Sequence, residues 1–397
     1  MSVRPKLLAA FLLLLILSAP AGSVAAYEPS PDPVPARARV LTVLEDEEAE
    51  EGPWGFALRR QTVTLRILTG PYRGQSFTVD NYIPGQPAYD IILSAGDTVL
   101  VAIEEAEGEP VAIFIEDFVR DQYLYVLAAL FALSLVAAGG RKGLRALLVL
   151  VLTILGVFFV LLPRLLAGSA PVPTTICVCA LVTLVTMLMV AGPGRKALAA
   201  TLGATGGVAV AGMLALYSGG LARLMGLNAQ EAQLLYYVED LTLDFRGLLF
   251  SGMILGALGA IMDVSMSIAS ATEEVRRAAP RLSPLALFQA GMNVGRDVMG
   301  TMANTLILAY TGGALPLLLL LMAYNASLIK VINLDLIATE VVRALTGSIG
   351  VVLSVPITAA LASAVFARPA GRRTVIRARA ISRPPVQRDL PPGSPPQ

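Results

Sequence analysis

Histidine is absent from the 397-residue chain. The protein therefore has no imidazole to serve as a general base, a proton relay or a zinc ligand, which excludes most hydrolytic and metalloenzyme mechanisms. The two cysteines, Cys177 and Cys179, lie two positions apart in an apolar run. Side chains at i and i+2 of a helix point away from each other, so the pair predicts neither a disulfide nor a metal site. We expect no metal and no cofactor.

Charged residues are scarce. They make up 15% of the chain against 55% hydrophobic residues, whereas a soluble domain carries about 25% charged residues. This apolar excess predicts an integral membrane protein with the lipid bilayer as its surroundings. The formal net charge of +1 argues against nucleic acid as a partner. Neither a Walker motif nor a dinucleotide-binding fingerprint is present.

The amino-terminal residues 1–26 have the layout of a secretory signal. A basic start (Arg4 and Lys6) is followed by an apolar core and by small residues before Tyr27. An uncleaved membrane anchor is the alternative interpretation. Both interpretations send the next segment across the membrane.

The segment after the signal is predicted to be extracytoplasmic and rich in β structure. Residues 27–37 are a proline-rich linker, and residues 38–117 contain short strand-like runs separated by glycine and proline turns. Five such runs predict a small all-β barrel or sandwich. The runs are Arg39–Leu44, Thr62–Leu68, Ser76–Val79, Thr98–Ile103 and Val111–Ile115.

Residues 122–367 are predicted to form a membrane α-helical bundle of about seven transmembrane helices. A helix needs about 20 residues to cross a hydrocarbon core of about 30 Å, and all but the first apolar run reach that length. Residues 368–397 form an arginine- and proline-rich tail that we expect to be disordered. The seven runs are 122–138, 144–163, 172–192, 197–217, 247–271, 299–323 and 346–366.

The basic residues predict the orientation. With the β domain outside, sixteen lysines and arginines fall on the other side of the membrane and five on the same side. The positive-inside rule then places the sixteen, including the carboxyl tail, in the cytoplasm. The signal segment predicts the same orientation, and thus a multipass protein of the cytoplasmic membrane. The minority of five comprises Arg164, Arg223, Arg246, Lys330 and Arg343.

One stripe of small and polar residues runs along the apolar segment 247–271. Gly252, Gly256, Gly259, Asp263 and Ser267 step by three or four and therefore share a helix face. The glycines predict close helix packing, as do Gly203 and Gly207 on the preceding span. A carboxylate in hydrocarbon costs about 2.5–3.5 kcal/mol on insertion scales. Asp263 therefore indicates either an ion, proton or substrate site, or a buried hydrogen bond that fixes packing.

The next span carries a second polar stripe. Asp297, Thr301 and Asn304 share a face, and Arg296 lies beside Asp297 near the predicted cytoplasmic entry. The amide of Asn304 needs partners in hydrocarbon. We expect Asp263 and Asp297 to lie at different depths, which argues against a catalytic aspartyl pair.

Two stretches in this region resemble the YibE/F-like family of bacterial multipass membrane proteins. They are GAIMDVSMSIASATEEV (Gly259–Val275) and AGMNVGRDVMGTMANTLILAYTGGALP (Ala290–Pro316). The similarity is specific over about 247–360, extends over 120–367, and is loose over the β domain. It supports the architecture and settles little about activity. The polar residues that match the family pattern are Asp263, Ser267, Asn293, Arg296, Asp297, Thr301, Asn304 and Thr305.

Three classes of function are compatible with these patterns. The first is a permease-like transporter of a small solute or ion, with the two polar stripes along its path. The second is a non-transporting assembly or accessory protein whose β domain binds an envelope partner. The third, an intramembrane enzyme, has the least support: without histidine only a lysine or a carboxylate could act as the base, and the candidate lysines flank the spans. We expect no catalytic residue. The sequence does not specify an oligomeric state.

Overall fold

A computed structural model describes residues 33–46, 59–86, 88, 90–106, 109–238, 243–324 and 327–367. The predicted signal segment 1–26, the first part of the linker 27–37 and the tail 368–397 lie outside the described residues. The chain divides into two compact units, with the division at Gly156.

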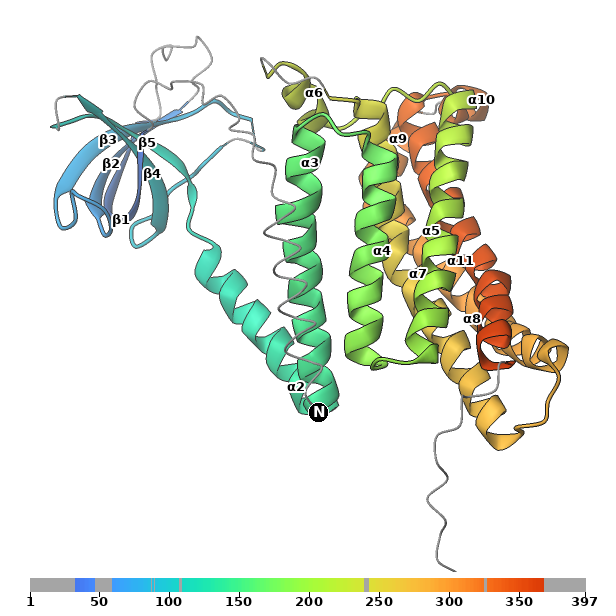
Figure 1. Cartoon of the computed structure of the whole chain (residues 1–397). Helices are drawn as coiled ribbons and strands as arrows, with labels where there is room; N and C mark the ends of the chain where they lie inside the picture. The colour runs from blue at the N-terminus through green and yellow to red at the C-terminus, as the bar shows by residue number, and fades with distance from the viewer. Residues whose placement is uncertain are drawn as a thin grey trace, which may run out of the picture. The chain divides into compact units, whose positions relative to one another are not determined.

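Five antiparallel strands form a single curved sheet in the order β3-β2-β1-β4-β5 (Figure 1). Strands β3 and β5, at the two ends of this order, also contact each other, so the sheet closes into a small barrel. The five predicted strands are therefore present. Each extends beyond its predicted run at one or both ends, although β2 stops one residue before the predicted end at Leu68. Their bounds are β1 (Val34–Asp46), β2 (Arg59–Ile67), β3 (Ser76–Ile83), β4 (Thr98–Ala106) and β5 (Glu109–Phe118).

Strand β1 begins inside the segment predicted as a linker. Val34 to Arg39 pair with Ile103 to Thr98 of β4. The physical reason is the alternation of side chains: Ala36 and Ala38 point into the barrel and are at most 1% exposed. The β domain thus starts four residues before the predicted boundary at 38.

Alternation also explains β2, where Val63, Leu65 and Ile67 are buried while the side chains between them face outward. These residues pack with Val99, Val101 and Ile103 of β4 in the barrel core. The turn before β4 depends on Gly96, whose φ of 100° is a conformation that favours glycine.

The first long helical segment folds back on itself. Helix α2 (Asp121–Gly156) contains one non-helical residue, Gly140, with φ 54° and ψ −131°. A Cβ placed on Gly143 would lie 2.0 Å from the carbonyl oxygen of Leu135, although residues eight apart in a straight helix are about 12 Å apart. The chain therefore reverses at Gly140, between the predicted runs 122–138 and 144–163, and Figure 1 shows the two arms of this hairpin.

The second arm continues through the π-helical turn η1 (Val157–Leu161) and α3 (Leu162–Leu166). The following helices form one bundle in which α11 packs on α5, α7 and α8, and α4 packs on α5 and α7. The bounds are α4 (Pro171–Val190), α5 (Arg195–Leu221), α6 (Gln230–Tyr236), α7 (Phe245–Ala278), α8 (Pro284–Gly313), α9 (Leu315–Ala323), α10 (Leu328–Ile332) and α11 (Asp335–Ala367).

Within the described residues, five helical segments are long and apolar enough to cross a membrane, and a sixth counts if α8 and α9 form one span bent by 59°. The first of the five, Asp121–Leu166, is 46 residues long and contains the reversal at Gly140. Arg343, expected in an outer loop, lies instead two turns inside the continuous helix α11.

The bundle core is built from apolar side chains of α7 and α11 and small residues of α5. Phe250, Ile261 and Ile268 of α7 are at most 1% exposed and pack in one cluster with Val355 of α11. Local capping fixes where two of these helices begin. Asp244 accepts a hydrogen bond from Gly247 N (2.9 Å) at the start of α7, and Ser283 precedes Pro284 at the start of α8.

Candidate functional site

The predicted stripe on α7 lies on the outer surface of the bundle. Gly252, Gly256, Gly259, Asp263 and Ser267 are all exposed, whereas the buried residues of α7 occupy the opposite side of the helix. These five residues therefore do share one face of the helix, as their spacing of three to four residues predicts. That face points away from the bundle core.

The glycines divide into two groups by what a side chain would meet. A Cβ on Gly203 would lie 2.1 Å from Thr358 Oγ1, and one on Gly207 would lie 2.7 Å from Ser354 Cβ. Both glycines of α5 therefore let α11 approach closely. Gly256 has a similar role toward one side chain, since its Cβ would lie 2.5 Å from Tyr310 Oη.

Gly252 and Gly259 do not have the packing role within the bundle that their spacing predicts. A Cβ on either would meet no described atom within 4 Å. Gly300 of α8 has the same open surroundings. No packing among the described parts of this chain requires glycine at these three positions.

The second predicted stripe also faces outward, along α8. Asn293, Arg296, Asp297, Thr301 and Asn304 are all exposed. Arg296 Nη1 donates a hydrogen bond to Asn293 Oδ1 (3.3 Å), so the guanidinium is held along its own helix. Among the described residues, neither Arg296 nor Asp297 forms an ion pair.

Helices α7 and α8 are antiparallel, and their contacts fix which residues share a depth. Gly291 lies against Thr272, and Gly295 lies against Ile268. Continued along the helices, this register sets Asp263 level with Gly300. Asp297 is then only about three residues, or ~4.5 Å along the axis, from the level of Asp263. The two carboxylates therefore differ in depth, as expected, but by less than one helical turn.

The interior of the described bundle has no charged side chain. Its buried polar residues are all threonines and serines, among them Thr272, Ser265 and Thr358. Thr358 Oγ1 donates to Ser265 Oγ (3.1 Å), and Thr272 donates to its own helix at Ile268 O (2.8 Å). Apolar side chains pack around these hydroxyl groups, so the described core of the bundle contains no path lined by charged residues.

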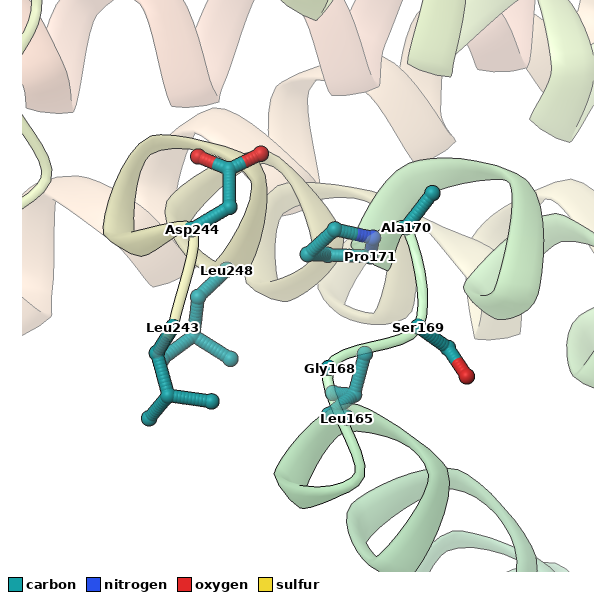
Figure 2. Close-up of a pocket in the computed structure, with 8 residues that line it drawn as sticks. All are labelled: Leu165, Gly168, Ser169, Ala170, Pro171, Leu243, Asp244 and Leu248. Carbon is teal, nitrogen blue, oxygen red and sulfur yellow. The ribbon is translucent and has the colours of Figure 1, made fainter. Parts of the chain in front are cut away.

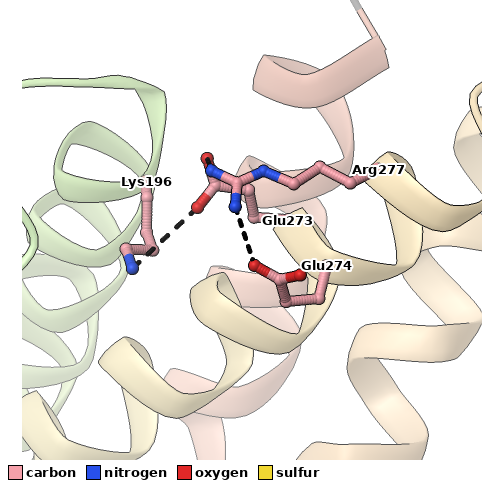
Figure 3. A network of polar contacts seen from close by, with 4 residues as sticks. All are labelled: Lys196, Glu273, Glu274 and Arg277. Carbon is pink, nitrogen blue, oxygen red and sulfur yellow. Dashed lines mark hydrogen bonds and ion pairs between the residues drawn. The ribbon is translucent and has the colours of Figure 1, made fainter.

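Two clusters of charged side chains lie apart from the two polar stripes. At one end of the bundle, Glu273 lies between Arg277 (3.0 Å) of its own helix and Lys196 (3.9 Å) at the start of α5, as Figure 3 shows. Further along, Arg343 Nη1 pairs with Glu340 Oε1 (3.2 Å) within α11. The apolar side of residues 327–345 predicts an amphipathic helix that includes this pair, and the structure makes residues 335–345 the first turns of the long helix α11.

A cavity of about 140 Å³ lies elsewhere, between the end of α3 and the start of α7. Figure 2 shows its mostly apolar lining, with the carboxylate of Asp244 at its edge. That carboxylate already caps α7. The cavity contains none of the residues of the two polar stripes. No group of three potential metal ligands occurs in the described part of the chain.

A small antiparallel barrel joined to a set of long apolar helices defines a class of protein that is compatible with a membrane location. Comparison with protein families gives the more specific assignment. The family model described as YibE/F-like protein matches residues 127–368, and the YibE/F family N-terminal domain matches residues 37–118. The chain belongs to the YibE/F-like family. No curated protein and no solved structure gave a match.

Proposed function

We propose that the protein is a multipass protein of the cytoplasmic membrane that acts as a permease-like transporter of a small polar solute or ion. The observation that carries this proposal is the exposure of Asp263 on the outer face of α7, level with the polar face of α8. A carboxylate facing hydrocarbon costs about 2.5–3.5 kcal/mol on insertion scales. The two polar faces must therefore meet water or protein, and a hydrated path along them satisfies both helices.

The proposed topology has seven spans. The reversal at Gly140 makes two spans of Asp121–Leu166, and α8 with α9 makes one bent span. The barrel is then extracytoplasmic and the carboxyl tail cytoplasmic, in agreement with the excess of lysine and arginine on the tail side. Arg141 and Lys142 lie directly after the reversal, where this topology puts a cytoplasmic turn.

The proposed path runs along the outside of one bundle and not through its core. The described core is filled by apolar side chains with only serine and threonine among them. Charged and amide groups, which mark solute and ion paths in membranes, gather instead on the exposed faces of α7 and α8.

The test is flux through proteoliposomes that contain the full-length protein. Protons are followed with an enclosed pH-sensitive dye, and glycerol, glycine, glutamate and lysine are followed by vesicle swelling. We expect Asp263→Asn to abolish the flux seen with the unmodified protein. Glu274→Gln, which neutralises an exposed carboxylate at the end of the same helix, should leave it unchanged. Equal flux in Asp263→Asn, or no flux above protein-free vesicles with any probe, would reject transport.

A second candidate function is an accessory role in which the β domain binds an envelope component. The outer face of β2 and β3 favours it: Thr62 pairs with Asp80 across the strands (2.7 Å), and Arg66 and Tyr82 lie exposed on the same two strands. Barrels of the OB type bind oligosaccharides through this face, although the analogy is one of fold alone. Pull-down of peptidoglycan fragments with the full-length protein, against Arg66→Ala and Tyr82→Ala, tests it.

A further inference from the structure

The structure leaves the polar faces of both α7 and α8 without cover from other described residues, in the part of the bundle that the proposed topology places in the membrane. We define the outer face as the exposed residues of the two stripes on α7 and α8 together with the exposed Gly300, which lies level with Asp263. They are Gly252, Gly256, Gly259, Asp263 and Ser267 on α7 and Asn293, Arg296, Asp297, Gly300, Thr301 and Asn304 on α8.

We propose that a second copy of this chain covers the outer face, so that two chains enclose the polar path between them. The inference rests on the proposed membrane location and function. It goes beyond the proposed function because it says which molecule closes the path on the side away from the bundle.

Charge is the first argument for a second copy. The outer face carries one cation, Arg296, and two anions, Asp263 and Asp297, and none of the three has an ion-pair partner among the described residues. A two-fold interface brings the same surface patch of both copies together, so each cation can meet the anions of the other copy. Each copy can therefore place its one cation against an anion of the other copy, which leaves one carboxylate of each copy for the polar path.

Depth is the second argument. Both copies insert in the same orientation, so their two-fold axis runs along the membrane normal and equivalent residues share a depth. Arg296 and Asp297 are adjacent, and the α7–α8 register puts Arg296 about four residues, or ~6 Å, from the level of Asp263. A cation on one copy is therefore at the right depth to meet either carboxylate of the other.

The open glycines are the third argument. A Cβ added to Gly252, Gly259 or Gly300 would have no described atom within 4 Å, unlike one added to Gly203 or Gly207. Small residues on a membrane helix allow a neighbouring backbone to approach closely. Such an approach would bury Asp263 against protein and polar groups instead of lipid.

The test is cysteine cross-linking of the full-length protein in its membrane. The background carries Cys177→Ser and Cys179→Ala. Single cysteines are then placed on the outer face (Gly259→Cys or Gly300→Cys), and matched controls on the exposed side of α5 (Leu202→Cys or Met213→Cys). Copper-phenanthroline oxidation should convert most of the outer-face variants to disulfide-linked dimers of this chain. The α5 variants should stay monomeric.

A charge exchange tests the pairing itself and guards against misfolding. Arg296→Asp should reduce the cross-link at Gly259→Cys at least tenfold, because the outer face then carries acids only. Adding Asp297→Arg should restore it. Monomers at both outer-face positions, a cross-link to a different protein, or a cross-link insensitive to these charges would overturn the proposal.

Failure here is distinct from failure of the proposed function. If the protein transports solute but does not cross-link, the proposed function stands and the second copy is rejected. If it cross-links as a dimer but transports nothing, the second copy stands and transport is rejected.

Discussion

Thr358 of α11 donates a hydrogen bond to Ser265 of α7 across 3.1 Å, and both side chains are fully buried. This bond joins two long helices at the point where Gly203 of α5 also comes within contact of Thr358. Three helices therefore meet around one threonine. These contacts around Thr358 hold α5, α7 and α11 together on the side of α7 opposite its exposed stripe.

Removing this hydrogen bond should lower the free energy of unfolding of the bundle, and a double-mutant cycle should show a coupling energy between Thr358 and Ser265. Thr358→Val keeps the shape of the side chain and removes the donor, while Ser265→Ala removes the acceptor. Hydrogen bonds between membrane helices are worth about 0.6 kcal/mol on average and at most about 1.7. We expect the double variant to be less destabilised than the sum of the single ones by about that amount. Thermal unfolding in detergent measures it, and strictly additive effects would contradict the prediction.

Two glycines of α8 should respond oppositely to the same substitution. A Cβ on Gly295 would lie 2.2 Å from Val355 Cγ1, so Gly295→Ala should cost about 1–3 kcal/mol through overpacking. Gly300 has no described neighbour within 4 Å. Gly300→Ala should therefore leave the fold of the single chain unchanged or slightly more stable, because alanine is the better helix former, and any cost should fall on the proposed contact with the second copy. The yield of folded protein after detergent extraction compares the pair. Equal losses in both variants would show that α8 packs differently.

The architecture was predictable where the periodicity of the sequence has one physical meaning. Alternation in Val63, Leu65 and Ile67 can serve only a sheet with one buried face. The chain reversal occurs at Gly140, within the glycine-rich break that separates the first two predicted runs. The start of β1 at Val34 was missed because prolines suggested a linker, although Pro35 lies in an outward-facing position.

The direction of the polar stripes was not predictable in the same way. In water, the apolar face of a helix must turn inward, but in lipid both faces of a helix can be apolar. The spacing of Gly252, Gly259 and Asp263 thus defines a face without saying which neighbour it meets. The relative depth of Asp263 and Asp297 was equally inaccessible, because it depends on how α7 and α8 are paired.

Acid should weaken the β domain through Asp117. Arg120 donates a hydrogen bond to this carboxylate, and with the backbone N–H of Phe118 it lowers the pKa of Asp117 below its ordinary value of 3.8. Because the pKa of Asp117 is lower in the folded than in the unfolded protein, its ionised form stabilises the folded domain at pH values above the unfolded-state pKa. This stabilisation is lost as the pH falls through the folded-state pKa. Because Asp117 is about half exposed, the effect is small.

The measurement is thermal unfolding of the β domain in the full-length protein between pH 6 and about pH 2. Asp117→Asn should flatten the decline seen below about pH 4. Glu104→Gln, which changes another exposed carboxylate of the same barrel, serves as the control. Curves for Asp117→Asn and the unmodified protein that run parallel would contradict the assignment.

The strongest single effect in the barrel should come from Gln61. Its side chain is 2% exposed, accepts hydrogen bonds from Leu93 N (3.0 Å) and Asn81 Nδ2 (3.3 Å), and donates to Leu93 O (3.3 Å). Asn81 Nδ2 in turn donates to Ile91 O (2.7 Å). Together these bonds hold the segment before β4 against the barrel.

Gln61→Leu would leave the Leu93 backbone groups without this partner in a buried place, at about 1–3 kcal/mol for each unpaired group. We therefore expect the segment around Leu93 to become the first site of proteolytic cleavage in the full-length protein. Thr64→Val, on the outward face of the same strand, should change stability by no more than about 0.5 kcal/mol. If protease cut both variants and the unmodified chain at equal rates, the amides of Gln61 and Asn81 would not be what holds this segment in place.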